Sequence, residues 1–503
     1  MPDNQGQSDI LLLETPFLSQ TGSEETRAYV QSKYNLALLA LGSYVKARSG
    51  FSVSLINMVK DRIDEDALVD RLKARPPKIV GVPLYSYNLS YSYRIISHLK
   101  RALPRIHVCV GGPHLRMYPE ETIRLPNVDS IVRGDGEEPF LQVCRQVIER
   151  GELDEDNLPP GTSTKASLAR GVLAEPWYVD DLDSLPVPDL TLLGDYSRYR
   201  DFVSGRIMAI LTTSRGCPYT CDYCSSKTAK YRSLSVPRVI EMMGHCKEHG
   251  VEYIEFWDET FNPNKRRLSE FADALLEADI RIPWGIRGAV VLHVPYETMC
   301  KLKRTGLRVI QFGVETGRPR LIEYLNKRVD PATIQEAFET CRRAGVRTVA
   351  NLMLNIPSET REEMLGDLRF LKKLRPTFVS ISVYNWAPGT SHYAKALRTG
   401  VLEEDHWRRF ANHPVGDEPV IHPRTEVPID EVYALRDAFT WRYYFNIAYV
   451  LRYALTAEFR EVRRAFSIAM LVFKTRLRSA AAAMRSRFSR SRRYAQAGMR
   501  LIF

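Results

Sequence analysis

Three cysteines lie close together near the middle of the 503-residue chain, in the spacing Cys217-x-x-x-Cys221-x-x-Cys224. They come directly after an apolar run at 207–211, which is typical of a buried strand. Three thiolates this close can bind three irons of a [4Fe–4S] cube and leave the fourth iron without a protein ligand. A metal with an open coordination position can react, as in catalytic zinc sites. The triplet therefore predicts a catalytic iron–sulfur cluster.

The alternatives are a zinc site or three ordinary thiols. Structural zinc sites usually combine two C-x₂₋₄-C pairs, whereas Cys246, Cys300 and Cys341 each stand alone in this chain. Eight cysteines in so long a chain do not make a disulfide framework. Together with the triplet they indicate a reducing compartment, and we expect the protein in the cytoplasm.

The residues before the triplet predict a doubly wound parallel sheet over residues 1–150. Short apolar runs alternate there with helical stretches. Ligands of such sheets bind outside the carboxyl ends of the strands, and glycines in the loops there let the backbone approach a flat or bulky ligand. The expected strands are 10–13, 52–55, 79–82, 107–110 and 130–132. The residues of the glycine-rich loops after the last two are Gly111, Gly112, Pro113, His114, Gly134, Gly136 and Glu137.

Two further segments follow. Residues 151–205 are rich in Pro, Asp and Ser and read as a linker. Residues 206–395 return to alternating strands and helices, which predicts a partial (β/α)₆ barrel with its active face at the carboxyl ends of the strands. The expected barrel strands are 207–213, 253–257, 283–288, 309–314, 348–354 and 378–384. The cysteine triplet follows the first of them, where catalytic residues belong.

The last segment, 396–503, is expected to be helical and ends in a basic tail. Residues 460–503 hold twelve Lys and Arg against one Glu, which accounts for the whole net charge of +11. A basic amphipathic tail suits an anionic membrane surface on the inner face of a membrane. Nucleic acid, which we consider unlikely, and a solvated helix are the alternatives. The apolar run 465–473 is too short to span a bilayer, and the first nine residues do not resemble a signal peptide.

The cysteine spacing and three later motifs together resemble the radical S-adenosylmethionine (SAM) superfamily. These motifs are Phe-Trp-Asp-Glu-Thr-Phe at 256–261, Gly-Val-Glu-Thr-Gly at 313–317 and Asn-Ile-Pro-Ser-Glu-Thr at 355–360. The N-terminal sheet, with its two glycine-rich loops, resembles the Rossmann-like cobalamin-binding domain that precedes the barrel in many of these enzymes. The resemblance to the cobalamin-binding radical SAM family covers about residues 9–395.

This resemblance implies a [4Fe–4S] cluster that binds SAM through its open iron and cleaves it to a 5′-deoxyadenosyl radical. It places Tyr223 against the adenine, Asp258 or Glu259 near the methionine ammonium, and Glu315 near the ribose or the ammonium. The alternative for the three carboxylates is that they cap helices at the end of the barrel. Cobalamin would lie against the glycine-rich loops, with Ser86 and Tyr87 beside the corrin. His114, which ends the first of these loops, would either contact the corrin or pack within the loop.

One departure from the family pattern concerns the loop after the first strand. Many cobalamin proteins carry Asp-x-His-x-x-Gly there, and the histidine binds cobalt from below. Residues 14–19 read Glu-Thr-Pro-Phe-Leu-Ser, without histidine. If cobalamin binds, no histidine of this loop binds its cobalt, and a vestigial domain remains an alternative.

The resemblance implies an enzyme, and we expect a methyltransferase that acts on an unactivated carbon of a lipophilic small molecule. It would use a 5′-deoxyadenosyl radical together with methylcobalamin, and an external electron donor of the flavodoxin or ferredoxin type. An oxidative cyclase or ring-rearranging enzyme of the same architecture is the alternative. A tRNA-modifying radical SAM enzyme is more remote, because the N-terminal region holds only Cys109 and Cys144. A non-enzymatic zinc protein is the remaining alternative.

The ligand assignment predicts the effect of alanine at Cys217, Cys221 or Cys224. Each single variant should lose the cluster, because a thiolate is the ligand of one iron, and with it all SAM cleavage. Iron content and 5′-deoxyadenosine production after anaerobic reconstitution measure both losses. Cys300→Ala is the control, because Cys300 stands apart from the triplet. Production of 5′-deoxyadenosine by any of the three variants would contradict the assignment.

Overall fold

The computed structural model describes residues 8–16, 33–228 and 230–464. Within these residues the chain divides into two compact units. The first comprises residues up to 200 together with 207–441, and the second comprises 201–206 together with the residues from 442 onward. The first unit contains two six-stranded sheets, and each unit is described by itself below.

The first sheet confirms the expected N-terminal α/β fold. Its strand order is β2-β1-β3-β4-β5-β6, and every pair is parallel except β5 with β6. The strands are β1 (Ile10–Glu14), β2 (Val53–Asn57), β3 (Ile79–Pro83), β4 (His107–Gly111), β5 (Ser130–Val132) and β6 (Thr162–Thr164). The sixth strand lies in the segment that was expected to be a linker. It consists of Thr-Ser-Thr, so no apolar run marked it in the sequence.

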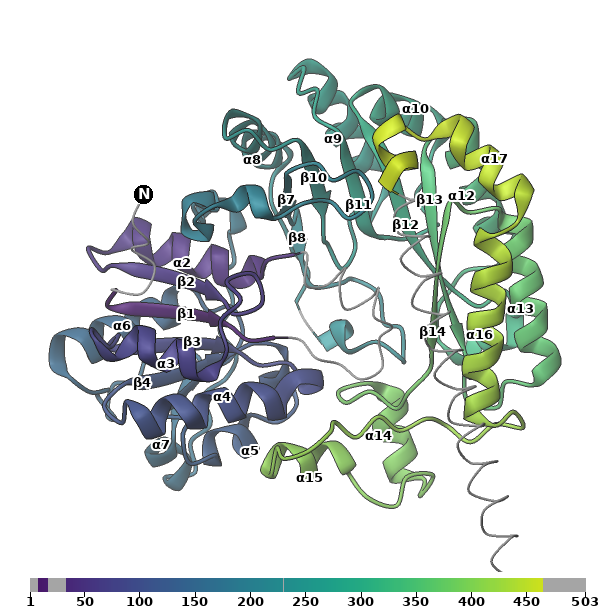
Figure 1. The fold of residues 1–503 in the computed structure, drawn as a ribbon. Helices are drawn as coiled ribbons and strands as arrows, with labels where there is room; N and C mark the ends of the chain where they lie inside the picture. Colours follow the sequence, from purple (N-terminus) through teal and green to yellow (C-terminus); the bar gives the residue numbers. More distant parts are fainter. Residues whose placement is uncertain (1–7, 17–32, 229, 465–503) are drawn as a thin grey trace, which may run out of the picture. The chain divides into compact units, whose positions relative to one another are not determined.

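Helices cover both faces of this sheet (Figure 1). On one face, α3 (Glu65–Lys73), α4 (Leu89–Ala102) and α5 (Pro119–Arg124) pack with Leu11, Leu13 and other inward residues in one buried cluster. On the other face, α2 (Leu36–Arg48) and α6 (Glu137–Arg150) lie over Leu12 and Gly81. Side chains of a strand alternate between its two faces, which explains why consecutive leucines of β1 are all buried.

The second sheet confirms the partial barrel. Its six parallel strands lie in chain order, from β7 at one edge to β14 at the other. The strands are β7 (Met208–Leu211), β10 (Tyr253–Phe256), β11 (Trp284–Ala289), β12 (Leu307–Glu315), β13 (Arg347–Leu354) and β14 (Phe378–Val383). The helices that pack in succession along its outer face are α8 (Val236–Glu248), α9 (Lys265–Glu277), α10 (Tyr296–Arg304), α12 (Pro331–Arg343) and α13 (Arg361–Leu374).

The two faces of the barrel sheet differ in polarity. Phe256 and Trp284 point outward and pack with Phe271 of α9 in a cluster of edge-to-face rings. Glu255 and Arg287 point inward, where the Arg287 Nε atom lies 2.5 Å from the Glu255 carboxylate. Burial alone would raise the pKa of Glu255, but the charges of Arg287 and Lys33 lower it to about 2. The barrel interior therefore holds a buried, ionised network and is not a purely apolar core.

A short segment, 33–35, joins the two sheets within the first unit. The Tyr34 hydroxyl donates to the Ile210 carbonyl at 3.1 Å and accepts from the Ile210 N–H at 2.6 Å, so it pairs the open side of the edge strand β7. The Lys33 ammonium lies 3.1 Å from Glu255 in the barrel. The Asn35 N–H donates to Glu14, at the end of β1 in the first sheet. These three residues attach the start of α2 to both sheets.

Of the remaining described α-helices, α7 (Lys165–Ala169) follows β6 and α11 (Pro319–Tyr324) follows β12. The other four lie at the C-terminal side of the chain. They are α14 (Ser391–Arg398), α15 (His406–Asn412), α16 (Ile429–Tyr444) and α17 (Ile447–Thr456), and α17 belongs wholly to the second unit. Within the part of the chain that the structure describes, no helix is long and apolar enough to cross a membrane. Most of the basic tail, from residue 465, lies outside the described residues, so its expected contact with a membrane stays a prediction.

Candidate functional site

The cysteine loop is closed at its base by a two-stranded ribbon. Strands β8 (Ser214–Arg215) and β9 (Arg232–Ser233) pair antiparallel, with Arg215 directly opposite Arg232. The loop between them carries Cys217, Cys221 and Cys224, all half-buried and none in a disulfide. It follows β7, so the thiols stand at the carboxyl end of the first barrel strand, as the sequence predicts.

The three thiols share one environment that fits an iron–sulfur cluster. Burial raises the pKa of the Cys221 and Cys224 thiols. The Cys217 thiol raises both pKa values further, and Cys224 adds to the effect at Cys221, so the three lie within electrostatic reach. Among the described residues, no group of three His, Cys, Asp or Glu is placed to bind a single metal ion. In a cube each thiolate binds a different iron, so cluster ligands stand further apart than the ligands of one zinc ion.

Two of the expected SAM-binding residues meet beside this loop. The Tyr223 hydroxyl forms a hydrogen bond with Glu315, whose carboxylate also accepts from Lys327 at 3.3 Å. Glu315 ends β12 with φ at +63°, a left-handed conformation that is uncommon for a residue with a side chain. Non-glycine residues held in that region often mark functional sites. The contact between Tyr223 and Glu315 supports their assignment to one site.

The neighbouring carboxylates Asp258 and Glu259 point in different directions. Glu259 is exposed and lines a cavity, whereas Asp258 is buried. The Asp258 Oδ1 atom accepts from the Thr213 N–H, the Thr213 hydroxyl and the Ser214 hydroxyl at 2.6–2.9 Å. Burial raises the pKa of Asp258 to about 6 in spite of these hydrogen bonds. The geometry makes Asp258 a support for the start of the cysteine loop, and it leaves Glu259 the more accessible of the two for a ligand.

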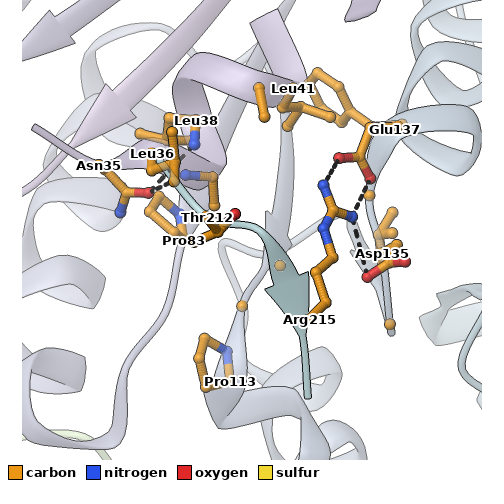
Figure 2. Close-up of a pocket in the computed structure, with 18 of the residues that line it drawn as sticks. Asn35, Leu36, Leu38, Leu41, Pro83, Pro113, Asp135, Glu137, Thr212 and Arg215 are labelled. Carbon is orange, nitrogen blue, oxygen red and sulfur yellow. Dashed lines mark hydrogen bonds and ion pairs between the residues drawn. The ribbon is translucent and has the colours of Figure 1, made fainter. Parts of the chain in front are cut away.

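A cavity of about 830 Å³ lies between the carboxyl ends of the first sheet and the cysteine loop (Figure 2). One wall comes from the first sheet and α2, including Pro83, Asn35 and Leu38. The opposite wall comes from the barrel, including Thr212 and Trp257. Of the nine residues expected to hold cobalamin, six line the cavity: Gly111, Gly112, Pro113, Gly134, Gly136 and Glu137.

Two of the four glycines of this wall, Gly112 and Gly134, are required by the local backbone. A Cβ atom at Gly112, where φ is +99°, would lie 2.8 Å from the Leu84 carbonyl oxygen, and one at Gly134 would overlap the backbone of Trp177. At Gly111 and Gly136 no atom comes closer than 3.6 Å to the added Cβ, so a side chain there would project into open space. The volume and the bare glycine wall fit a large planar cofactor such as a corrin.

Ser86, Tyr87 and His114, the other three expected cobalamin residues, do not line the cavity. The Ser86 hydroxyl and the His114 Nδ1 atom are hydrogen-bonded at 2.8 Å, and both side chains are buried. Burial lowers the pKa of His114 to about 4, which keeps the ring neutral. The Tyr87 hydroxyl donates to Asn385 at 3.1 Å. Ser86 and Tyr87 lie in a short turn of helix after β3 and His114 lies in one after β4, and both turns direct these side chains into the protein, which the sequence pattern did not reveal.

An ion-pair network ties the cysteine loop to the second glycine-rich loop. The Arg215 guanidinium lies 2.6 Å from the Glu137 carboxylate and 3.3 Å from Asp135 (Figure 2). Arg232 also pairs with Asp135. Burial disfavours the charge of Arg215, but Glu137 and Asp135 outweigh it and raise its pKa. Thus a residue two positions before the first cysteine is fixed to the wall expected to hold cobalamin.

Sequence reasoning missed several residues of the cavity. Glu14 lines it from the end of β1, and its carboxylate accepts from the Asn35 N–H and from the Asn57 side-chain amide at 2.7 Å. Burial raises the pKa of Glu14 to about 7. The sequence did contain a signal for Glu14, because a carboxylate that ends an otherwise apolar strand lies where ligands of such sheets bind. The importance of Arg215 could not be read in this way, since its partners are far away in the sequence.

Comparison with known protein families agrees with both halves of the site. Residues 28–144 match the B12 binding domain, and residues 211–371 match the Radical SAM superfamily. The first match contains the glycine-rich loops, and the second contains the three cysteines and the motifs at 256–261, 313–317 and 355–360.

Individual relatives cover most of the chain. An uncharacterized methyltransferase of Pyrococcus horikoshii is 28% identical over 389 residues, which are 75% of this chain and 81% of that protein. The anaerobic magnesium-protoporphyrin IX monomethyl ester cyclase of Rubrivivax gelatinosus is 25% identical over 351 residues, 68% of this chain and 63% of that one. The solved structure of the cobalamin-dependent S-adenosylmethionine radical enzyme OxsB, with aqua-cobalamin and S-adenosylmethionine bound, has the same fold. Its TM-score is 0.66 at 18% identity, covering 92% of this chain and 70% of that one.

The ion-pair network predicts the effect of Arg215→Gln. Glu137 would lose its partner while still buried, so the midpoint of thermal unfolding should fall by roughly 2–5 °C. Glu137→Gln in the same chain should restore part of the loss, because the uncompensated charge is then gone. The exposed pair of Arg266 and Glu270 offers a control, and Arg266→Gln should change the midpoint by less than about 1 °C. Equal effects of the two arginine variants would contradict the role given to Arg215.

The raised pKa of Glu14 predicts a pH dependence. A carboxyl group with a folded-state pKa of about 7 binds more protons when folded than when unfolded between its ordinary value of 4.5 and 7. Stability should therefore fall as pH rises through that window and stay level above it. Between pH 5.5 and 8.5 the loss is about 2 kcal/mol.

Glu14→Gln should remove this loss, and thermal unfolding of corrin-free wild type and variant at the two pH values measures it. The exposed Glu152→Gln serves as the control and should keep the wild-type pH dependence. An identical pH dependence of wild type and Glu14→Gln would rule out the shifted carboxyl.

Proposed function

The chain belongs to the cobalamin-binding radical SAM enzymes, and we propose that it is a methyltransferase acting on an unactivated carbon of a lipophilic small molecule. The observation that carries the proposal is the single cavity lined both by the glycine-rich loops and by Arg215 and Gly216, directly before the first cysteine. A cavity that extends from the glycine-rich loops to the start of the cysteine loop would allow cobalamin and the cluster to act on the same substrate.

The residues present fit the cofactors of the family. Cys217, Cys221 and Cys224 would hold the [4Fe–4S] cluster, and the glycine wall of the cavity would hold cobalamin. Tyr223, Glu259 and Glu315 would bind SAM at the open end of the barrel. When bound, the cluster with SAM supplies a carbon radical that removes a hydrogen atom, and cobalamin supplies a methyl group.

The protein's own side chains have positioning tasks in this proposal. Arg215, Asp135 and Glu137 fix the cysteine loop relative to the cobalamin wall. Asp258 holds the end of β7, from which that loop begins. The Cys217 thiol lies 3.0 Å from the Thr260 hydroxyl, so Thr260 can donate a hydrogen bond to the thiolate. Such outer contacts orient metal ligands and tune the metal they bind.

The overall reaction sets the partners that we propose. Replacing a C–H hydrogen by methyl at the expense of two SAM molecules yields one S-adenosylhomocysteine, one 5′-deoxyadenosine and one methionine, and it consumes two electrons. The donor of these electrons would be an external protein of the flavodoxin or ferredoxin type. We further propose that the cobalamin-binding domain ends near residue 150 and that the barrel ends near residue 395. The basic tail would contact an anionic membrane from the cytoplasmic side.

An oxidative cyclase is the second candidate, favoured by the similarity to the cyclase of Rubrivivax gelatinosus. A cyclase would also release 5′-deoxyadenosine, but it would transfer no methyl group. The two functions therefore differ in the fate of the SAM methyl.

The test uses anaerobically purified, iron-reconstituted protein with hydroxocobalamin, a strong reductant and SAM labelled with deuterium in its methyl group. We expect the corrin to stay bound through gel filtration, the label to appear on the corrin, and S-adenosylhomocysteine to be released. Cys300→Ala should behave as wild type, and Cys217→Ala should still retain the corrin. Release of 5′-deoxyadenosine without any label on the corrin would contradict a methyltransferase and favour the cyclase.

A further inference from the structure

We propose that helix α17 (Ile447–Thr456) is a membrane-interface helix whose outer face lies in the surface of an anionic lipid bilayer. The helix has two distinct sides. Tyr449 and Tyr453, one turn apart, are half-buried and stack with their ring planes 12° apart. On the opposite side Ile447, Leu451 and Leu455 recur at helical spacing and are 77%, 59% and 86% exposed.

The exposed side of α17 is apolar along its whole length. Val450 lies beside the three residues and is half exposed, and Phe459 continues the surface beyond the end of the helix at 82% exposure. Large apolar side chains gathered on one exposed helix face are unusual unless they contact a partner, because each loses hydrophobic stabilisation in water. A helix of ten residues is about 15 Å long, so it can lie in the plane of a membrane surface but cannot span it.

The excess of basic residues around α17 favours an anionic lipid surface as the partner. Residues 438–457 contain no Asp or Glu, and their charged residues are Arg442 and Arg452. The next acidic residue, Glu458, pairs with Arg206 at 2.7 Å, also in the second unit. From Arg460 onward the sequence holds twelve Lys and Arg against one Glu. Anionic lipids attract such a segment, whereas a second copy of the chain would bring two of them together and be repelled.

The full chain tests this assignment by co-sedimentation with vesicles of phosphatidylcholine and phosphatidylglycerol in the ratio 7:3. We expect wild type to bind these vesicles and to bind vesicles of pure phosphatidylcholine much less. Leu451→Asn with Leu455→Asn should lower the partition coefficient roughly 10- to 100-fold, since two leucines no longer enter the apolar layer. The matched control is Val401→Asn with Val415→Asn, two exposed valines of the first unit, which should bind within about twofold of wild type.

A second measurement reports insertion directly. Leu451→Trp should gain fluorescence that bromine-labelled lipid quenches more strongly than it quenches wild type. Equal quenching of Leu451→Trp and wild type would overturn the role of α17. Vesicle binding that is unchanged in the double asparagine variant would do the same, and the basic segment alone would then contact the lipid. Absence of vesicle binding, or a dimer in ultracentrifugation that the asparagine variant dissociates, would also overturn the role of α17. These readouts require no methyl transfer, so they fail or succeed independently of the proposed function.

Discussion

The site depends on carboxylates that offset the repulsion between two arginines facing each other across the ribbon at the base of the cysteine loop. Arg215 and Arg232 are directly opposite in the ribbon that closes the cysteine loop, and like charges in that position repel. Asp135 and Glu137 of the glycine-rich loop supply the opposite charges. The ribbon is therefore stable only where it meets that loop. This contact brings the ligand loop of the cluster and the cobalamin wall to one cavity, from which the proposed chemistry follows.

A second set of contacts, made by residues 33–35, also connects the first sheet to the barrel beside the cavity. Residues 33–35 bind Glu255 inside the barrel, Ile210 on the edge of β7 and Glu14 at the end of β1. Because Glu255 is buried and ionised, its partners Lys33 and Arg287 must stay in place, since an unpaired buried charge is costly. The two sheets are thus connected by ion pairs and hydrogen bonds beside the cavity, and buried apolar residues from both parts of the first unit, such as Leu11 and Ile356, also belong to one continuous cluster.

Local sequence patterns were sufficient to predict the elements of regular structure. The mostly apolar runs at 253–257 and 348–354 became β10 and β13 nearly residue for residue, because their outward faces are apolar even though the inward face carries polar residues such as Glu255. The glycines that line the cavity could also be chosen from the sequence, since they depend on residue type at fixed local spacing. The assignment of the three cysteines as cluster ligands rests on the same kind of pattern and stays a prediction. By contrast, β6 consists of three polar residues and leaves no such pattern.

What the sequence could not supply were contacts between distant segments. Arg215 and Glu137 are 78 positions apart, and nothing near either residue indicates the other. His114 was expected near the corrin because it ends a glycine-rich loop, yet its ring turns inward to Ser86. Asp258 and Glu259 are neighbours with similar chemistry, and only the backbone direction makes one a buried support and the other an exposed wall residue. Side-chain direction in loops is set by tertiary packing, which local patterns do not encode.

The central claim is that one cavity brings cobalamin and the cluster together. Low-temperature electron paramagnetic resonance of the holoprotein tests it most directly, because cob(II)alamin and the reduced cluster each carry an unpaired spin. The account predicts that reduction of the cluster broadens or splits the cob(II)alamin signal, and that Cys217→Ala restores the unperturbed signal while corrin remains bound. Two independent signals in the wild-type holoprotein would contradict it.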